Sequence, residues 1–401
     1  MRYERTKSLR AMVAALSVAL LAACGGAAAP ASGTATASNS SVASAAKPAV
    51  SAAASGPIAS ASSNWNDVIA AAKKEGKVSF IGPQGDQMRD ALAAGFQKAY
   101  PGVEVDLQQL AGDQTGPKVL TPMAAGQHPF DFAITGSATA IRSLKPANVL
   151  VPIKDWLVGP NDSDPSQWLN NKFTFDDKEG TYNMVFSAYV KAPWVVNGDK
   201  VDPAEFKSNK DLLDPKWKDK IVFRNPRAAG GGLSVVTYWW ATPSLGKDFI
   251  KQFGTQNPVI ENDDRQVLDD TSRGKYLIAI GASDVLTTEF MKRGLPLKYV
   301  PSSQLSEGAY ITSGNGTMVI FKQPPHPNAL KLYLDYFLSK EGQTAWTNAS
   351  GIASYRKDVP HDNVVPFLVP KEGVTYQDNS SEEIVDLQPQ VGPYLDQVWP
   401  K

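Results

Sequence analysis

Apolar positions repeat with two different periods near the start of the globular part of the chain, and the two periods alternate. Helical spacing covers Trp65–Glu75 and places Met88, Leu92 and Phe96 on one face of a second segment. The stretches KVSFIG and VEVDLQQL, which follow these two segments, have the character of strands. Helices and strands in alternation predict βαβ units, and these imply a parallel sheet covered by helices.

The alternation continues through most of the chain. We expect further helices at Pro117–Gly126, ATAIRSLK, GGLSVVTYWW, Asp263–Arg273 and TTEFMKRG, further strands at FDFAITG, KIVFRNPR and KYLIAIG, and one long helix at PHPNALKLYLDYFLSKEGQTAW. Two stretches, Lys172–Asn197 and Glu307–Phe321, have extended or irregular character without helices. Two α/β units joined by two extended crossings predict an α/β fold of two lobes with a hinge of two crossover segments.

These changes of pattern also predict where the lobes begin and end. Removing the first 63 of 401 residues leaves 338, which is too long for one ordinary core and suits two domains. We expect lobe one to comprise residues 64–190 and 309–401, and lobe two residues 191–308.

The first 23 residues have the pattern of an export signal. Four basic residues and one acid stand in the first ten positions, and the apolar segment Ala11–Ala23 is shorter than the roughly 20 residues that span a bilayer. Leu21–Ala23 lead directly into Cys24, which resembles the bacterial lipobox, in which the cysteine is acylated and becomes the first mature residue. A chance cysteine in an ordinary cleaved signal peptide is the alternative.

Residues 24–63 predict a lipidated cysteine followed by a flexible tether. Gly25–Ser63 consists almost wholly of Ala, Ser, Thr, Gly and Pro, and such a chain cannot bury enough apolar area to fold. We therefore expect an extracytoplasmic protein, lipid-anchored at the cell surface or in the periplasm. Because Cys24 is the only cysteine, the globular part has neither a disulfide nor a cysteine nucleophile. A formal net charge of zero without a basic run argues against nucleic-acid binding.

Five segments together resemble a known family. WNDVIAAAKKEGKVSFIG, FDFAITG, DLLDPKWKDKIVFRNPR, RGKYLIAIG and PHPNALKLYLDYFLSKEGQ, in this order, are similar to extracellular solute-binding proteins of the ferric-iron ABC transporter type. The resemblance covers Trp65 to about Asn363. It implies the type II periplasmic-binding-protein fold, in which a monomer holds a small solute between its lobes and delivers it to a membrane permease.

In open α/β sheets, ligands bind beyond the carboxyl ends of the strands. The sharpest candidate there is FRNPRAAGGG, where Gly230 and Gly231 would expose backbone N–H groups at a helix start to an anion. Arg224 and Arg227 could add contacts to a carboxylate or phosphate. The resemblance implies an oxyanion at this turn. The alternative is a flexible loop whose arginines pair with surface acids.

Three other loops supply the remaining candidates. We expect ligand contacts from Gln84, Asp86, Ser137, Thr139, Ser283 and Asp284, all of which follow predicted strands. Capping of the next helix is the alternative for the hydroxyls and for Asp86.

Direct iron ligation is doubtful despite the resemblance. Ferric binders of this family supply two adjacent tyrosines, and this sequence has no Tyr-Tyr pair. His128, His326 and His361 each adjoin a proline, away from the candidate loops. We therefore expect no cofactor and no metal ligands.

We therefore expect a transport protein that binds a small anionic solute or a ferric complex and delivers it to an ABC importer. A lipoprotein that senses a solute for a signalling partner is the alternative. A tethered hydrolase is disfavoured because no GxSxG, HExxH or Walker motif is present.

Overall fold

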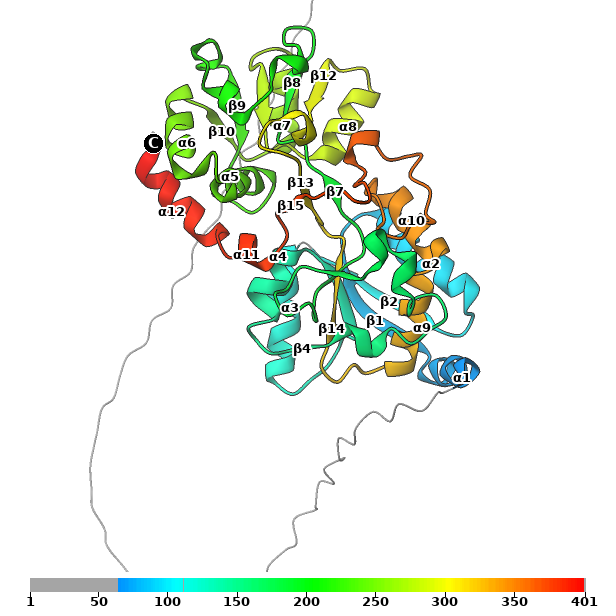
Figure 1. Cartoon of the computed structure of the whole chain (residues 1–401). Helices are drawn as coiled ribbons and strands as arrows, with labels where there is room; N and C mark the ends of the chain where they lie inside the picture. The colour runs from blue at the N-terminus through cyan, green and yellow to red at the C-terminus, as the bar shows by residue number, and fades with distance from the viewer. Residues whose placement is uncertain (1–63, 111, 400–401) are drawn as a thin grey trace, which may run out of the picture. The chain divides into compact units, whose positions relative to one another are not determined.

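The computed structural model describes residues 64–110 and 112–399 (Figure 1). The predicted signal segment, Cys24 and the tether lie outside these residues. The helices are α1 (Trp65–Glu75), α2 (Asp86–Ala99), α3 (Gly112–Ala124), α4 (Ser137–Thr139), α5 (Gly231–Ala241), α6 (Gly246–Phe253), α7 (Asp264–Ser272), α8 (Asp284–Lys292), α9 (Pro327–Phe337), α10 (Lys340–Ser350), α11 (Glu382–Val385) and α12 (Gln388–Val398). The strands are β1 (Lys77–Gly82), β2 (Glu104–Gln109), β3 (Phe132–Thr135), β4 (Leu150–Val151), β5 (Thr174–Phe175), β6 (Met184–Val185), β7 (Tyr189–Val190), β8 (Trp194–Asn197), β9 (Ile221–Arg224), β10 (Val259–Glu261), β11 (Ile278–Ile280), β12 (Leu297–Val300), β13 (Tyr310–Thr312), β14 (Thr317–Phe321) and β15 (Gln377–Asp378).

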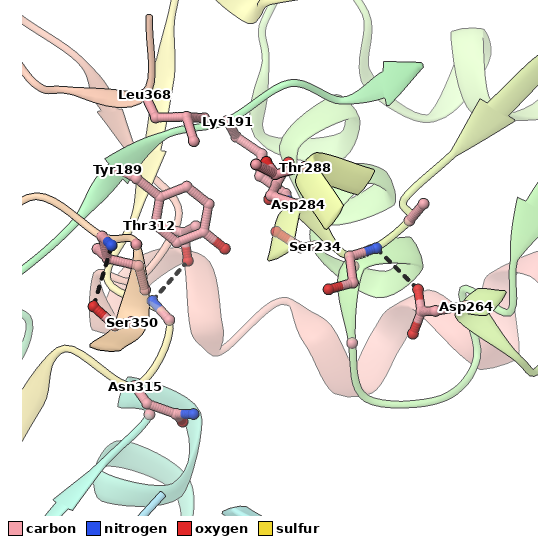
Figure 2. A pocket seen from close by; sticks show the side chains of 18 of the residues that line it. Tyr189, Lys191, Ser234, Asp264, Asp284, Thr288, Thr312, Asn315, Ser350 and Leu368 are labelled. Atoms are coloured by element: carbon pink, nitrogen blue, oxygen red, sulfur yellow. Dashed lines mark hydrogen bonds and ion pairs between the residues drawn. The ribbon is translucent and has the colours of Figure 1, made fainter. Parts of the chain in front are cut away.

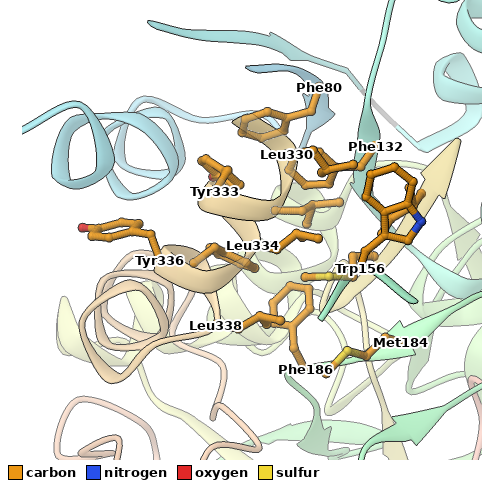
Figure 3. Packing of buried hydrophobic residues seen from close by; sticks show 14 of the residues in the cluster. Phe80, Phe132, Trp156, Met184, Phe186, Leu330, Tyr333, Leu334, Tyr336 and Leu338 are labelled. Atoms are coloured by element: carbon orange, nitrogen blue, oxygen red, sulfur yellow. The ribbon is translucent and has the colours of Figure 1, made fainter. Parts of the chain in front are cut away.

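The first sheet has the order β2-β1-β3-β14-β6-β5, with β4 also paired to β14. Its first three strands are parallel, as the βαβ pattern predicts, whereas β14 runs antiparallel to β3. Helix α9 covers this sheet, and Figure 3 shows Leu330, Tyr333 and Leu334 of the helix directed toward Phe80 and Phe132 of the strands. The Phe80 and Phe132 rings stack with centroids 4.4 Å apart. This aromatic cluster forms the hydrophobic core of the first lobe.

The second sheet has the order β10-β9-β11-β8-β12. Strands β9, β10 and β11 are parallel, and β8 and β12 pair antiparallel to their neighbours. Helix α5 packs against it, and its buried residues include Val235, Tyr238 and Trp239. This sheet therefore has its own hydrophobic core, and the two-lobed α/β fold is confirmed.

The two sheets are joined by extended segments, as the sequence predicts. Strand β7, in the first crossing, pairs antiparallel with β13, in the second. A third segment, β15, pairs parallel with β13, so the connection is a small sheet of the order β15-β13-β7 (Figure 1). We call residues 377–381, which contain β15 and the turn after it, the strap.

The C-terminal helix α12 packs on the second sheet. Val391, Leu395 and Trp399 belong to the same hydrophobic cluster as Phe223, and the Trp399 indole N–H donates to the carbonyl of Ile250 at 2.8 Å. The lobe boundaries remain a prediction, and we propose one change to them: residues 388–399 are part of lobe two, although the sequence pattern placed them in lobe one.

Two predicted helices differ in their details from the structure. The expected long helix is two helices, α9 and α10, because the Ser339 side chain accepts from the Gly342 N–H and begins a new helix there. The expected helix at 138–145 is the short α4 followed by a wider turn at Ala140–Leu144. No helix within the described part of the chain is both long and apolar enough to span a membrane.

Candidate functional site

A cavity of about 1000 Å³ lies where the two lobes and the crossing strands meet. Its polar lining side chains are mostly hydroxyls and amides, and they come from both lobes, the crossing strands and the strap. Those with polar or charged groups are Gln87, Ser137, Tyr189, Lys191, Ser234, Asp264, Ser283, Asp284, Thr288, Glu289, Lys292, Arg293, Thr312, Asn315, Asn348, Ser350, Asn363, Asn379, Ser380 and Gln388. Figure 2 shows Tyr189, Thr312, Ser350 and Asn315 on one side of this space and Ser234, Asp264 and Asp284 on the other.

Half of the ten predicted contact residues line this cavity. Ser137, Gly230, Gly231, Ser283 and Asp284 are all found in its wall, although they come from loops that are distant in the sequence. Ser283 also caps α8, since its side chain accepts from the Leu286 N–H at 3.4 Å. Ser137 does not cap α4; its hydroxyl instead donates to the buried carboxylate of Asp176.

The other five predicted residues do not line the cavity. Arg224 pairs with Asp264 at 3.2 Å and Arg227 with Asp396 at 2.7 Å, so the alternative of paired arginines describes this geometry. Gln84, before α2, and Asp86, its first residue, are exposed, and their neighbour Gln87 lines the cavity instead. Gly85 is the N-cap residue of α2, and no side chain makes a capping hydrogen bond there. Thr139 is in α4, outside the lining. A ligand role for these residues stays a prediction.

The glycine run at the start of α5 is required by close backbone packing. A side chain on Gly232 would collide with the carbonyl oxygen of Arg224, and one on Gly231 would collide with that of Gly281. Gly230 has φ 138°, which an L side chain rarely adopts, and the space beside it is open. The glycines therefore bring the ends of β9 and β11 against the first turn of α5 and leave that turn facing the cavity, where its free N–H groups favour an anion.

A buried ion pair forms part of the lobe-two wall. The Lys191 ammonium donates to the Asp284 carboxylate, and the two side chains are 5% and 8% exposed. Burial lowers the pKa of Lys191, but the charge and hydrogen bond of Asp284, together with Tyr189 and Tyr299, outweigh it, so the pKa of Lys191 lies above its ordinary value. The Tyr189 ring lies 5.5 Å from the ammonium. Lys191 and Asp284 both line the cavity, so their charges face a bound solute.

Arg224, behind the same wall, forms a second ion pair with Asp264, which lines the cavity. Asp264 also accepts from the Ser283 N–H at 3.0 Å, which ties the α7 start to the α8 start (Figure 2). The third lining carboxylate, Glu289, lies 3.7 Å from Arg293 and 4.0 Å from Arg265. All three lining carboxylates are therefore paired with cations.

Sequence reasoning missed the contributions of the crossing strands. Tyr189, Lys191 and Thr312 come from segments that were read as connections. A lysine at the end of a strand-like run, in YVK, is the one signal that could have pointed to a site. Asn379 and Ser380 of the strap follow no predicted strand and gave no signal.

The described residues contain no cluster of three or more His, Cys, Asp or Glu side chains that could hold a metal ion. Tyr189 is the sole tyrosine in the cavity lining. A site built from two adjacent tyrosines is thus not found among the lining residues.

Residues 81–344 match the family model of bacterial extracellular solute-binding proteins. The chain belongs to this family. No match was found among curated proteins. Solute-binding proteins of this kind serve ABC importers and are not enzymes, so the chain is an extracytoplasmic solute-binding protein, as its sequence predicted.

Solved structures share the fold of this solute-binding protein at low identity. A FutA protein (IdiA) from Trichodesmium, in complex with iron and citrate, is 21% identical with a TM-score of 0.64, and the match covers 81% of this chain and all of that one. Iron-bound HitA from Pseudomonas aeruginosa is 20% identical with a TM-score of 0.60, over 79% and 99% of the two chains. AfuA from Actinobacillus pleuropneumoniae, with fructose-6-phosphate bound, is 18% identical with a TM-score of 0.57, over 80% and 98%.

Proposed function

We propose that this chain is the lipid-anchored, monomeric receptor of an ABC importer and that it captures a small hydroxylated organic anion in the cavity between its lobes. One observation supports the anionic character above the others. The lining has three carboxylates, all paired, and three cations, so its side-chain charges balance, and the first turn of α5 adds backbone N–H groups that face the cavity. These N–H groups, at the positive end of the helix dipole, favour an anion.

The hydroxylated character of the solute follows from the neutral groups of the wall. Serine, threonine, asparagine and glutamine side chains supply most of the polar lining, and they can both donate and accept hydrogen bonds. A solute with several hydroxyls matches such a wall better than a simple inorganic ion does. Citrate and fructose-6-phosphate, which occupy the related structures, belong to this class.

Capture would work by closure of the lobes. A solute that contacts Asn315 of lobe one and the α5 start of lobe two at the same time binds the closed state better than the open one. Strands β7 and β13 are short and lie between the two sheets, so they are the natural hinge. Delivery to the permease would follow from recognition of that closed state.

A thermal-shift series on the full chain, purified in detergent, tests the solute class. Citrate, fructose 6-phosphate, glucose and spermidine represent hydroxylated anions, a neutral sugar and a cation. We expect stabilisation by one of the anions, worth about 2.7 kcal/mol at a hundredfold its Kd. Stabilisation by spermidine or glucose alone would refute the anionic class.

A paired variant sharpens this experiment. Lys191→Met combined with Asp284→Asn removes both charges of the buried pair and keeps the side-chain sizes similar, so the anion should lose most of its stabilising effect. Lys216→Met, on the surface away from the cavity, is the control that should leave the effect unchanged.

The anchor is tested separately, because it is independent of the solute. Mass spectrometry of the chain from a membrane fraction should find Cys24 acylated at the mature N-terminus, and Cys24→Ser should release the protein. An unmodified chain that is released without the substitution would contradict the anchor.

A further inference from the structure

The cavity is larger than citrate or a hexose phosphate requires. Helix α8 contributes lining residues at helical spacing along its whole length, namely Asp284, Thr288, Glu289, Lys292 and Arg293. The cavity therefore follows this helix for about 13 Å. Its volume of about 1000 Å³ stands at the upper end of the pockets that hold drug-sized ligands. A solute as small as citrate would fill only part of it.

One part of the lining is apolar. Ile352, Val365 and Leu368 come from the segment that follows α10, and Tyr189 comes from the crossing strand β7. Val365 and Leu368 lie on the same face of a short turn, because the Leu368 N–H donates to the carbonyl of Val365 at 2.9 Å. We call Tyr189, Ile352, Val365 and Leu368 the apolar patch.

The members of the apolar patch adjoin one another. A methyl group on Gly314 would lie 3.4 Å from Tyr189 Cε1 and 3.8 Å from Ile352 Cδ1, so both side chains contact the same point. Strand β7 contacts the turn that contains Leu368. Figure 2 shows Leu368 beside Tyr189, across the cavity from Ser234 near the start of α5. The apolar patch and the α5 turn are therefore on opposite sides of the cavity.

Polar groups beside the apolar patch are already hydrogen-bonded within the chain. The Asn363 amide donates to Asn348 Oδ1 at 3.0 Å, and the Ser350 hydroxyl oxygen accepts a backbone N–H at 3.1 Å. The side chains of Ser234 and Asn315, in contrast, have no hydrogen-bond partner among the residues that the structure describes. A polar group of a solute would lose water at the apolar patch without gaining a partner, whereas an apolar group would not.

The charges along α8 leave the apolar patch unchanged in character. Glu289, Lys292 and Arg293 are exposed, so they belong to the mouth of the cavity and stay hydrated. The buried cation nearest to the Tyr189 ring, Lys191, is paired with Asp284. An uncharged group of the solute is therefore the one that fits this part of the wall.

We propose that the solute is a hydroxylated organic anion with an apolar substituent, whose anionic group lies at the α5 turn while an aromatic or aliphatic group covers the apolar patch. This inference rests on the proposed function and narrows its solute class. The substituent distinguishes the solute from other anions, because burial of a phenyl-sized group should tighten binding by roughly tenfold to a hundredfold.

Titration calorimetry on the full chain tests this class with matched pairs of anions. Lactate is compared with 3-phenyllactate, and glucose 6-phosphate with phenyl glucoside 6-phosphate, so the anionic group is kept and a phenyl ring is added. In at least one pair the phenyl member should bind roughly tenfold to a hundredfold more tightly. Equal binding within both pairs would refute the apolar substituent and leave the proposed function standing. Binding by none of the four, nor by citrate or fructose 6-phosphate, would refute both.

A double variant locates the phenyl group. Ile352→Thr with Val365→Thr places hydroxyls on the apolar patch at two partly exposed positions, so the fold should be kept. The advantage of the phenyl member should fall at least about tenfold, and the member without the ring should keep its wild-type Kd. Val259→Thr, at an exposed valine outside the cavity lining, is the matched control that should change neither affinity.

Two other results of the double variant would overturn the inference. An equal loss of affinity for both members of a pair would mean that the apolar patch packs against lobe two when the lobes close and not against the solute. An undiminished preference for the phenyl member would mean that the ring binds at another part of the wall.

Discussion

The two lobe walls of the cavity are made from different chemistry. The lobe-two wall contains the ion pairs Lys191–Asp284 and Arg224–Asp264 and the tightly packed glycine turn. The lobe-one wall presents Ser137, Asn315 and other neutral groups, and Asn315 is exposed. One wall is thus held rigid by charge pairs and backbone contacts, whereas the other offers hydrogen-bonding groups with little charge. Substitutions that break a pair or a close contact in the first wall should therefore lower stability, whereas those in the second should change solute affinity with little effect on stability.

The largest effect is expected from breaking the buried ion pair. Lys191→Met leaves the Asp284 carboxylate buried without a cation, which should lower the free energy of unfolding by about 3–5 kcal/mol. Denaturant unfolding of the full chain measures this loss. The double variant with Asp284→Asn should recover much of it, because the uncompensated charge is gone. A loss below about 1 kcal/mol for the single variant would mean that the pair behaves as an exposed one.

Glycine substitutions compare the two walls directly. Gly232→Ala drives a methyl group into the carbonyl of Arg224, a backbone atom that cannot move aside, and should cost about 1–3 kcal/mol or more. Gly136→Ala, at the lobe-one wall, meets the Gly314 carbonyl at 3.0 Å, which a small shift relieves. We expect a clearly smaller cost there. Equal costs in thermal unfolding would show that the two walls are packed alike.

The sequence predicted the architecture well because periodicity records burial. Alternating helices and strands with two extended crossings were enough to predict two lobes. Half of the residues that the strand-end rule selected as solute contacts line the cavity. The same reasoning could not predict the partner of an arginine. Arg224 and Arg227 point to Asp264 and Asp396, and these acids are 40 and 169 positions further along the chain.

The crossings and the strap were the harder part of the site. Tyr189 and Lys191 belong to a segment with no helix after it, so the rule that places ligands at strand ends did not select them. The strap pairs with β13 across more than sixty residues of sequence, and only the folded chain brings Ser380 beside Thr312. Short segments of this kind carry no periodic signal that a sequence pattern could reveal.

Neutral wall residues should affect binding with little effect on stability. Asn315→Ala should change the free energy of unfolding by less than about 0.5 kcal/mol, since the side chain is exposed. If Asn315 contacts the solute on closure, affinity for the stabilising anion should fall about tenfold, the equivalent of one hydrogen bond. Ser234→Ala is the matched change on lobe two, and titration calorimetry compares them. An unchanged affinity in both would mean that the solute does not bridge the walls.

The smallest effect is expected from Arg227, and it decides between the sequence prediction and the observed pairing. The Arg227–Asp396 pair is partly exposed, so Arg227→Ala should cost between 0 and about 1 kcal/mol of stability. If the arginine only holds α12 against the glycine turn, solute affinity should remain at the wild-type value, and Asp396→Ala should behave in the same way. A large loss of affinity in Arg227→Ala but not in Asp396→Ala would mean that the guanidinium leaves Asp396 when the lobes close and binds the solute directly. The comparison of the two walls would then change, since lobe two would contribute a mobile cation as well as a rigid frame.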